Sequence, residues 1–114
     1  AVGVPLYMGY VRDAKAASAQ ATIGVIANAE KLYHQFNGIF VNVADLSVVP
    51  NPLNIDVRDA AQYWNLNVSG ATVDVFTVTA TGKTGTEYEG IVVTLNYNRN
   101  GDEVWTRTDR GTPF

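Results

Sequence analysis

The single histidine, His34, is the first side chain to consider, because histidine is the commonest general base in enzymes. A catalytic base needs an oriented partner and a nucleophile within reach, and the sequence near His34 offers neither. A histidine near the C-terminal end of a helix stabilises the helix dipole, which is the role we expect here. With one histidine and no cysteine, a single chain cannot form a multi-histidine metal site, a thiolate metal site or a disulfide.

Three carboxylates, Asp45, Asp56 and Asp59, are the best candidates for a calcium site, because calcium prefers oxygen ligands. Their spacing does not match a known calcium-binding loop, so we expect solvated loop charges and no metal.

The segment from Gly82 to Gly85 contains a Gly-Lys-Thr string, which is part of a phosphate-binding loop in many nucleotide enzymes. Such a loop follows a strand and opens a helix, whereas this string lies between two expected strands. The neighbouring threonines are expected to favour strands on an exposed face and not to act as nucleophiles; they are Thr77, Thr79, Thr81, Thr84 and Thr86. We therefore expect no enzymatic activity and no cofactor.

The composition indicates one folded domain. The 114 residues are 46% hydrophobic and 17% charged, the net charge is −3, and the pI is about 4.9. An acidic chain gains little from the phosphates of a nucleic acid, so we expect no nucleic-acid partner. No basic run suggests a patch for a membrane surface.

A long helix is predicted from Val4 to Phe36. Alanine is frequent, and apolar residues recur with helical spacing at Ile23, Ile26 and Ala27, with Glu30 on the same face. Asn37 and Gly38 form a typical stop signal. About 32 residues give a helix of roughly 50 Å. Because a domain of this size is only about 26 Å wide, the helix must protrude.

The first half of this helix is expected to need partners. Residues 1–10 are apolar throughout, and the first charge is Arg12. The segment therefore resembles the last turns of a longer hydrophobic helix whose beginning is missing. A protruding helix of small apolar residues is not stable alone in water, so we expect it to pack with other subunits or with lipid.

The sequence divides into three segments. A helical segment over 1–37 is followed by a connecting loop over 38–61 and an antiparallel sheet over 62–114. The alternation of side chains places Trp64, Leu66 and Val68 on one buried face. The helical and the strand periodicities together predict an α+β fold. In this fold the helix packs on four strands, and Trp64 and Trp105 lie beneath the sheet. The expected strands are 63–68, 73–80, 90–97 and 103–108.

Two stretches of this sequence resemble the type IV pilins and the pseudopilins of type II secretion. Ala1 to Lys15 is similar to the end of their hydrophobic segment, with its Val-Pro-x-Tyr-like stretch followed by an Arg/Lys-Ala-Lys region. Glu30 to Phe40 is similar to the end of their helix, a Tyr-x-x-x-Asn-Gly-x-Tyr/Phe pattern. The strands from Tyr63 to Gly82 resemble the start of a pilin head.

The resemblance implies a structural role. The fold would be a long helix on a four-stranded antiparallel sheet, and the subunits would polymerise into a pilus, or fimbrium, through their N-terminal helices. Before assembly the chain would be held in the bacterial inner membrane by its missing N-terminal segment. Inner-membrane machinery with its own ATPase would then assemble an extracellular filament that serves adhesion or motility.

The resemblance also suggests which residues would meet between subunits. Arg12, Asp13 and Lys15 would form inter-subunit ion pairs. The residues expected to pack between subunits are Val4, Pro5, Leu6, Tyr7, Tyr10, Val11 and Ala14. Two alternatives remain, a secretion pseudopilin and a minor pilin that acts as a binding module. The calcium loop of major pseudopilins is not found, which favours a pilin.

Overall fold

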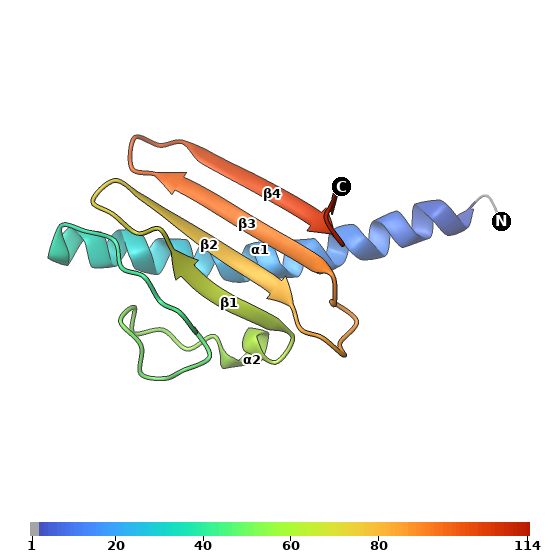
Figure 1. Ribbon diagram of the computed structural model, residues 1–114, viewed down its shortest axis with the longest axis horizontal. Coiled ribbons are helices and arrows are strands. Elements are labelled where there is room, and N and C mark those ends of the chain that lie inside the picture. Colours follow the sequence, from blue (N-terminus) through green and yellow to red (C-terminus); the bar gives the residue numbers. More distant parts are fainter. Residues whose placement is uncertain (1–2) are drawn as a thin grey trace.

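A helix of 35 residues, α1 (Gly3–Asn37), dominates the fold (Figure 1). The structure is a computed structural model that describes the backbone of residues 3–114 and the side chains from Val11 onward. The helix ends where the sequence predicts: Gly38 has a φ of +73°, and its N–H donates to the His34 carbonyl at 2.8 Å.

The segment after α1 is irregular and runs along the edge of the sheet. Val43 and Val68 exchange two backbone hydrogen bonds, and Leu46 N–H donates to the Leu66 carbonyl at 3.0 Å. A short helix, α2 (Arg58–Ala61), then leads into the sheet. The segment predicted as a loop therefore covers one sheet edge and ends in a helical turn.

The sheet is an antiparallel meander in the order β1-β2-β3-β4-β5. Its strands are β1 (Trp64–Ser69), β2 (Val75–Gly82), β3 (Ile91–Asn98), β4 (Glu103–Asp109) and β5 (Thr112–Pro113). The four predicted strands are present, and the two-residue β5 is an addition that the sequence pattern is too short to predict. The α+β fold class is confirmed.

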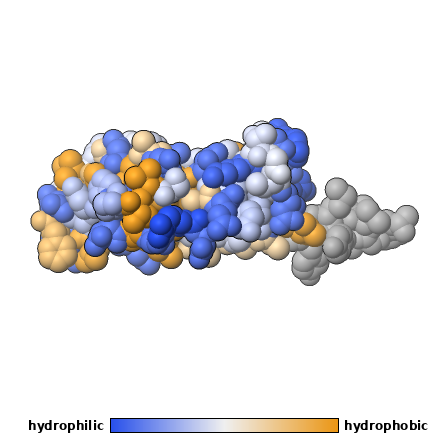
Figure 2. All heavy atoms as spheres, turned by 90° about the horizontal axis from the view of Figure 1, so that it is seen from below, coloured by the Kyte–Doolittle hydropathy of each residue, from blue (hydrophilic) through white to orange (hydrophobic). Residues whose placement is uncertain are grey.

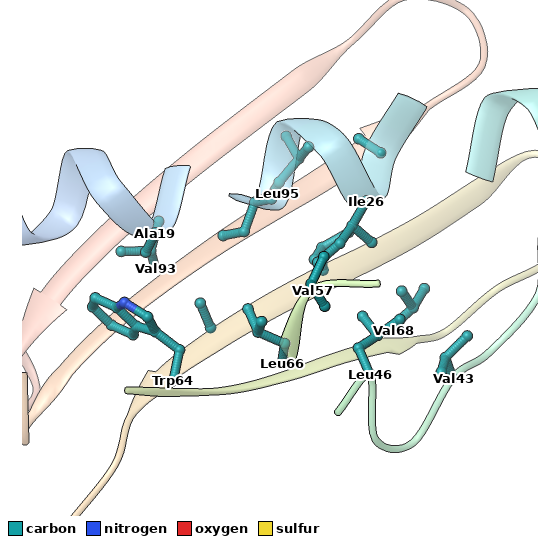
Figure 3. Close-up of a cluster of buried hydrophobic side chains, with 14 of the residues drawn as sticks. Ala19, Ile26, Val43, Leu46, Val57, Trp64, Leu66, Val68, Val93 and Leu95 are labelled. Carbon is teal, nitrogen blue, oxygen red and sulfur yellow. The ribbon is translucent and has the colours of Figure 1, made fainter. Parts of the chain in front are cut away.

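The core lies between α1 and the sheet (Figure 3). Ile23 and Ile26 of α1 are fully buried, and on β1 Trp64, Leu66 and Val68 form the buried face that their alternation predicts. α1 packs against β2 and β3, the middle strands of the sheet.

The prediction that Trp105 is buried beneath the sheet is wrong. Its register partner is Leu95, so Trp105 belongs to the face that bears the helix, but it is 36% exposed. Because α1 covers the middle strands, β4 lies beside the helix and not over it. A core-facing position on this strand is therefore still open to solvent.

The N-terminal part of α1 extends beyond the sheet, as Figure 1 shows. The molecule measures 54 × 30 × 18 Å, and a helix of this length spans about 52 Å at 1.5 Å per residue. The long dimension is thus the length of α1, and the predicted protrusion is confirmed. Among the described residues, no helix combines the length and the hydropathy that crossing a membrane requires.

Candidate subunit-packing surface

One face of α1 turns away from the sheet and is free of charge. From Ala14 to Phe36, the most exposed residues of the helix are uncharged, and the partly exposed Lys31 turns to Glu103 of β4. We call this face the outer helix stripe; it comprises Ala14, Ala17, Ser18, Ala21, Val25, Asn28, Leu32, Gln35 and Phe36. An uncharged helix face of this length is unusual next to water, where charged and polar residues normally lie.

The spacing within the stripe is that of a helix-packing seam. The positions Ala14, Ser18, Ala21, Val25 and Asn28 follow at alternating steps of four and three, and Leu32 and Gln35 continue them. An average step of 3.5 residues keeps one line of side chains against a neighbouring helix. The stripe is therefore suited to contact with another helix along most of its length.

Side-chain size increases along the stripe. Ala14, Ala17 and Ala21 lie near the protruding end, whereas Val25, Leu32 and Phe36 are 53%, 55% and 81% exposed towards the other end. Figure 2 shows apolar side chains gathered at the end of the molecule far from the N-terminus. Small residues allow helix backbones to approach closely, and exposed large apolar residues mark a surface that a partner covers.

The structure describes the side chains of only two of the residues predicted to pack between subunits, and their packing stays a prediction. The side chains of Val4, Pro5, Leu6, Tyr7 and Tyr10 lie outside the described ones, so their packing stays a prediction. Ala14 is exposed and Val11 is half-buried, and both lie on the described part of α1. Sequence reasoning did not assign Val25, Leu32 and Phe36 to the surface. The seven-residue spacing of Ser18, Val25 and Leu32 was a signal that could have found two of them.

The three predicted inter-subunit charges contact their own chain. The Arg12 guanidinium lies 3.7 Å from the Asp109 carboxylate, and the Arg107 guanidinium lies 3.8 Å from the Asp13 carboxylate. The Lys15 ammonium donates to the Glu87 carbonyl at 2.9 Å. These contacts fasten α1 to β4 and to the β2–β3 loop at the point where the helix leaves the sheet. An inter-subunit role for the three charges stays a prediction, and it would require these contacts to be shared or broken.

The other residues with chemical potential have local partners. A ring nitrogen of His34, Nε2, lies 2.9 Å from the Val73 carbonyl, at the helix end where a dipole role was expected. The Asp45 carboxylate accepts hydrogen bonds from the Ser47 hydroxyl and N–H, which lower the pKa of Asp45. Within residues 3–114, the structure brings no three histidine, aspartate or glutamate side chains together as a metal site would require.

Positive charge is balanced locally. Each of the five arginines and Lys31 lies within 4 Å of a carboxylate. The pairs are Arg12–Asp109, Lys31–Glu103, Arg58–Asp56, Arg99–Asp74, Arg107–Asp13 and Arg110–Asp109. A surface of paired charges gives little of the uniform positive potential that attracts nucleic acid.

Comparison with known families decides the assignment. Residues 5–89 match the family described as type IV minor pilin ComP, DNA uptake sequence receptor. The chain belongs to this family. The match runs from the first turns of α1 through β2 into the β2–β3 loop. No curated protein and no solved structure matches the chain.

The family assignment confirms the resemblance to type IV pilins and places the protein among the subunits of the pilus. The family description also names a DNA receptor, which conflicts with the expectation that no nucleic acid is a partner. The composition could not reveal such a property, because specific DNA contacts need only a few side chains and not an excess of basic residues.

Proposed function

We propose that this pilin is a structural subunit that polymerises with copies of itself into the pilus filament through α1. The observation that carries the proposal is the outer helix stripe, which is uncharged from Ala14 to Phe36 and has the spacing of a helix seam. The protruding end of α1 adds a surface beyond the sheet that the chain's own head does not cover.

The arrangement favours an open assembly. In the proposed contact, the protruding end of α1 in one subunit packs against the larger residues of the stripe in the next subunit. The two contacting surfaces are therefore different. Such head-to-tail contacts produce rings or helical filaments and not closed dimers. Burial of the parts that are still exposed would contribute about 1 kcal/mol each for Val25 and Leu32 and about 2 kcal/mol for Phe36.

The same proposal includes the setting that pilus assembly requires. The subunit would be held at the inner membrane by an N-terminal segment, passed to the assembly machinery and displayed outside the cell, where the pilus serves adhesion or motility. The role is structural and includes no enzymatic step.

The paired substitution Val25→Asp and Leu32→Asp tests the polymerisation proposal. Both side chains are more than half exposed, so we expect the isolated protein to keep its unfolding temperature. We expect pili to be lost, because two buried carboxylates would be left unpaired in the seam. The measurement is electron microscopy of cells in which the variant replaces the full-length subunit.

Val48→Asp is the matched control. Val48 is 55% exposed, which is close to the exposure of Val25 and Leu32, but it lies in the segment after α1. This variant should form normal pili. Intact pili on cells carrying the double aspartate variant at a normal protein level would contradict the proposal.

The family description favours a second candidate function, in which the head of this pilin binds a DNA sequence. Because the arginines are paired, little affinity would come from phosphates, and recognition would depend on contacts with base edges. Lys15 and Lys83 are the cations outside the ion pairs found in residues 3–114, and Lys15 already binds the Glu87 carbonyl.

Selection from a pool of random DNA duplexes tests this candidate. If it holds, one short sequence is enriched over rounds of capture on the immobilised pilin, and its affinity falls only weakly with salt because few phosphates are neutralised. A duplex with the same base composition in scrambled order is the control. Equal retention of all sequences, or a steep loss with salt, would count against a sequence receptor.

A further inference from the structure

The sheet face opposite α1 carries no charged side chain on β1 to β4. The alternation that buries one face leaves asparagine, threonine, serine and valine on the other. The register aligns them in rows across the four strands. The rows are Asn65-Thr81-Val92-Thr108, Asn67-Thr79-Thr94-Thr106 and Ser69-Thr77-Asn96-Val104.

A shallow hollow lies at one end of this face. Its volume is about 310 Å³, near the low end of the range for small-molecule sites. The start of β2, the end of β3 and the turn into β4 form it. We call it the Asn96 hollow; it is lined by Val75, Phe76, Thr77, Asn96, Tyr97, Asn98, Asp102 and Val104.

Hydrogen bonds fix how the two amides of the hollow present themselves. The Thr77 hydroxyl donates to Asn96 Oδ1 at 2.7 Å, which leaves the Asn96 NH₂ group as a donor. Asn98 Oδ1 accepts the Asn100 N–H at 3.1 Å, so its NH₂ group is also left as a donor. Both amides are thus oriented before a ligand arrives, which reduces the entropy lost on binding.

Asp102 supplies the acceptor. Its backbone N–H is held by Asn100 Oδ1 at 3.0 Å, and one carboxylate oxygen lies 3.3 Å from Asn100 Nδ2. A carboxylate has room for several hydrogen bonds, so Asp102 can accept from further hydroxyl groups. Val75 and Val104 add apolar surface beside these polar groups.

We propose that the Asn96 hollow binds one unit of a neutral sugar. A sugar ring carries hydroxyl groups that both donate and accept, and a C–H face that packs on apolar side chains. The NH₂ groups of Asn96 and Asn98, the Asp102 carboxylate and the two valines match these features. A phosphate or an acidic sugar is disfavoured, since the only charge in the lining is negative.

Titration of the full chain with galactose, glucose, mannose and N-acetylglucosamine tests the proposal. We expect one or more of these sugars to shift the side-chain amide NMR signals of Asn96 and Asn98, with a dissociation constant on the order of 1–10 mM, as for a small site with few contacts. The Asn67 amide, on the same sheet face but outside the hollow, should not move.

Asn96→Ala should weaken binding about tenfold because it removes a hydrogen bond to the sugar, and Asp102→Asn should do so because it replaces a charged acceptor with a weaker neutral one. Asn67→Ala is the matched control and should bind like the wild type. Asn96 and Asp102 are exposed, so the fold should survive, which the unchanged spectrum of the core would verify. The proposal is overturned if no sugar shifts Asn96 at about 50 mM, or if Asn67 shifts equally. It is independent of polymerisation, because Val25→Asp leaves the hollow intact.

Discussion

The free energy of unfolding of this pilin should fall by about 2.5 kcal/mol as the pH rises from about 5 to 8, owing to one buried carboxyl group. Glu30 of α1 is fully buried, and burial raises its pKa from 4.5 to about 7, although the hydrogen bond from the Val41 N–H acts in the opposite direction. In the unfolded chain the group is exposed and returns to its ordinary pKa.

The sign follows from which state binds the proton more tightly. Between the two pKa values the folded protein keeps Glu30 protonated, while the unfolded chain has lost the proton. The stabilisation from the neutral form is therefore complete below about pH 4.5 and is lost as the pH rises through about 7. Exposed carboxyl groups such as Asp45 and Asp56, whose pKa values are lowered, act in the opposite sense at acidic pH.

The geometry explains why Glu30 is kept despite this effect. Its Oε1 accepts the Val41 N–H at 2.9 Å, and its Oε2 is buried without a partner among the described residues. The bond joins α1 to the segment that follows it, next to Phe40, whose ring packs against Phe76 and Tyr97. A protonated Glu30 thus holds the junction between helix and head without a buried charge.

Glu30→Gln removes the titratable carboxyl group but keeps an oxygen that can accept the Val41 N–H, so it separates the two effects. The amide oxygen can still accept from Val41, so the unfolding temperature of the variant should change little between pH 5 and 8, whereas that of the wild type should fall by on the order of 10 °C. Thermal unfolding at several pH values measures both. Asp45→Asn is the control for an exposed carboxylate. Parallel pH profiles for wild type and Glu30→Gln would contradict the assignment.

Glu30 also illustrates what the sequence could predict. Helical spacing alone placed it on the same face as Ile23 and Ile26, and all three are buried. Its partner, Val41, could not be predicted, because it lies eleven positions along the chain in an irregular segment where no period fixes the backbone. Periodicity locates a face, whereas the partner of a single polar atom depends on tertiary structure.

The sequence indicated that α1 packs between subunits, but it did not identify the outer helix stripe. The apolar N-terminal residues indicated packing between subunits, yet sequence reasoning did not assign the exposed Val25, Leu32 and Phe36 to a surface. In sequence, the two apolar faces of α1 overlap, because a buried face and a seam both recur every three or four residues. Only the position of the sheet shows which residues it covers, and the same reason accounts for Trp105.

Among the glycines from Gly24 onward, Gly82 at the end of β2 should tolerate an added methyl group least. A Cβ on Gly82 would overlap the carbonyl oxygen of Tyr88, a backbone atom that also accepts the Ile91 N–H at 3.1 Å. The β2–β3 loop would have to move away from the strand. The same loop binds Lys15 of α1 through the Glu87 carbonyl at 2.9 Å, so the displacement would reach the point where the helix leaves the sheet.

Gly82→Ala should therefore lower the free energy of unfolding by about 3 kcal/mol, at the upper end of the usual range for one substitution. Denaturant unfolding followed by tryptophan fluorescence is a suitable measurement, since the Trp64 ring lies 5.0 Å from that of Tyr88. Gly24→Ala in α1 is the matched control: nothing lies within 4 Å of its added Cβ, and it should stabilise the helix by about 0.5–1 kcal/mol. If Gly82→Ala were as stable as the wild type, the close approach of Tyr88 to Gly82 would not hold the β2–β3 loop in place.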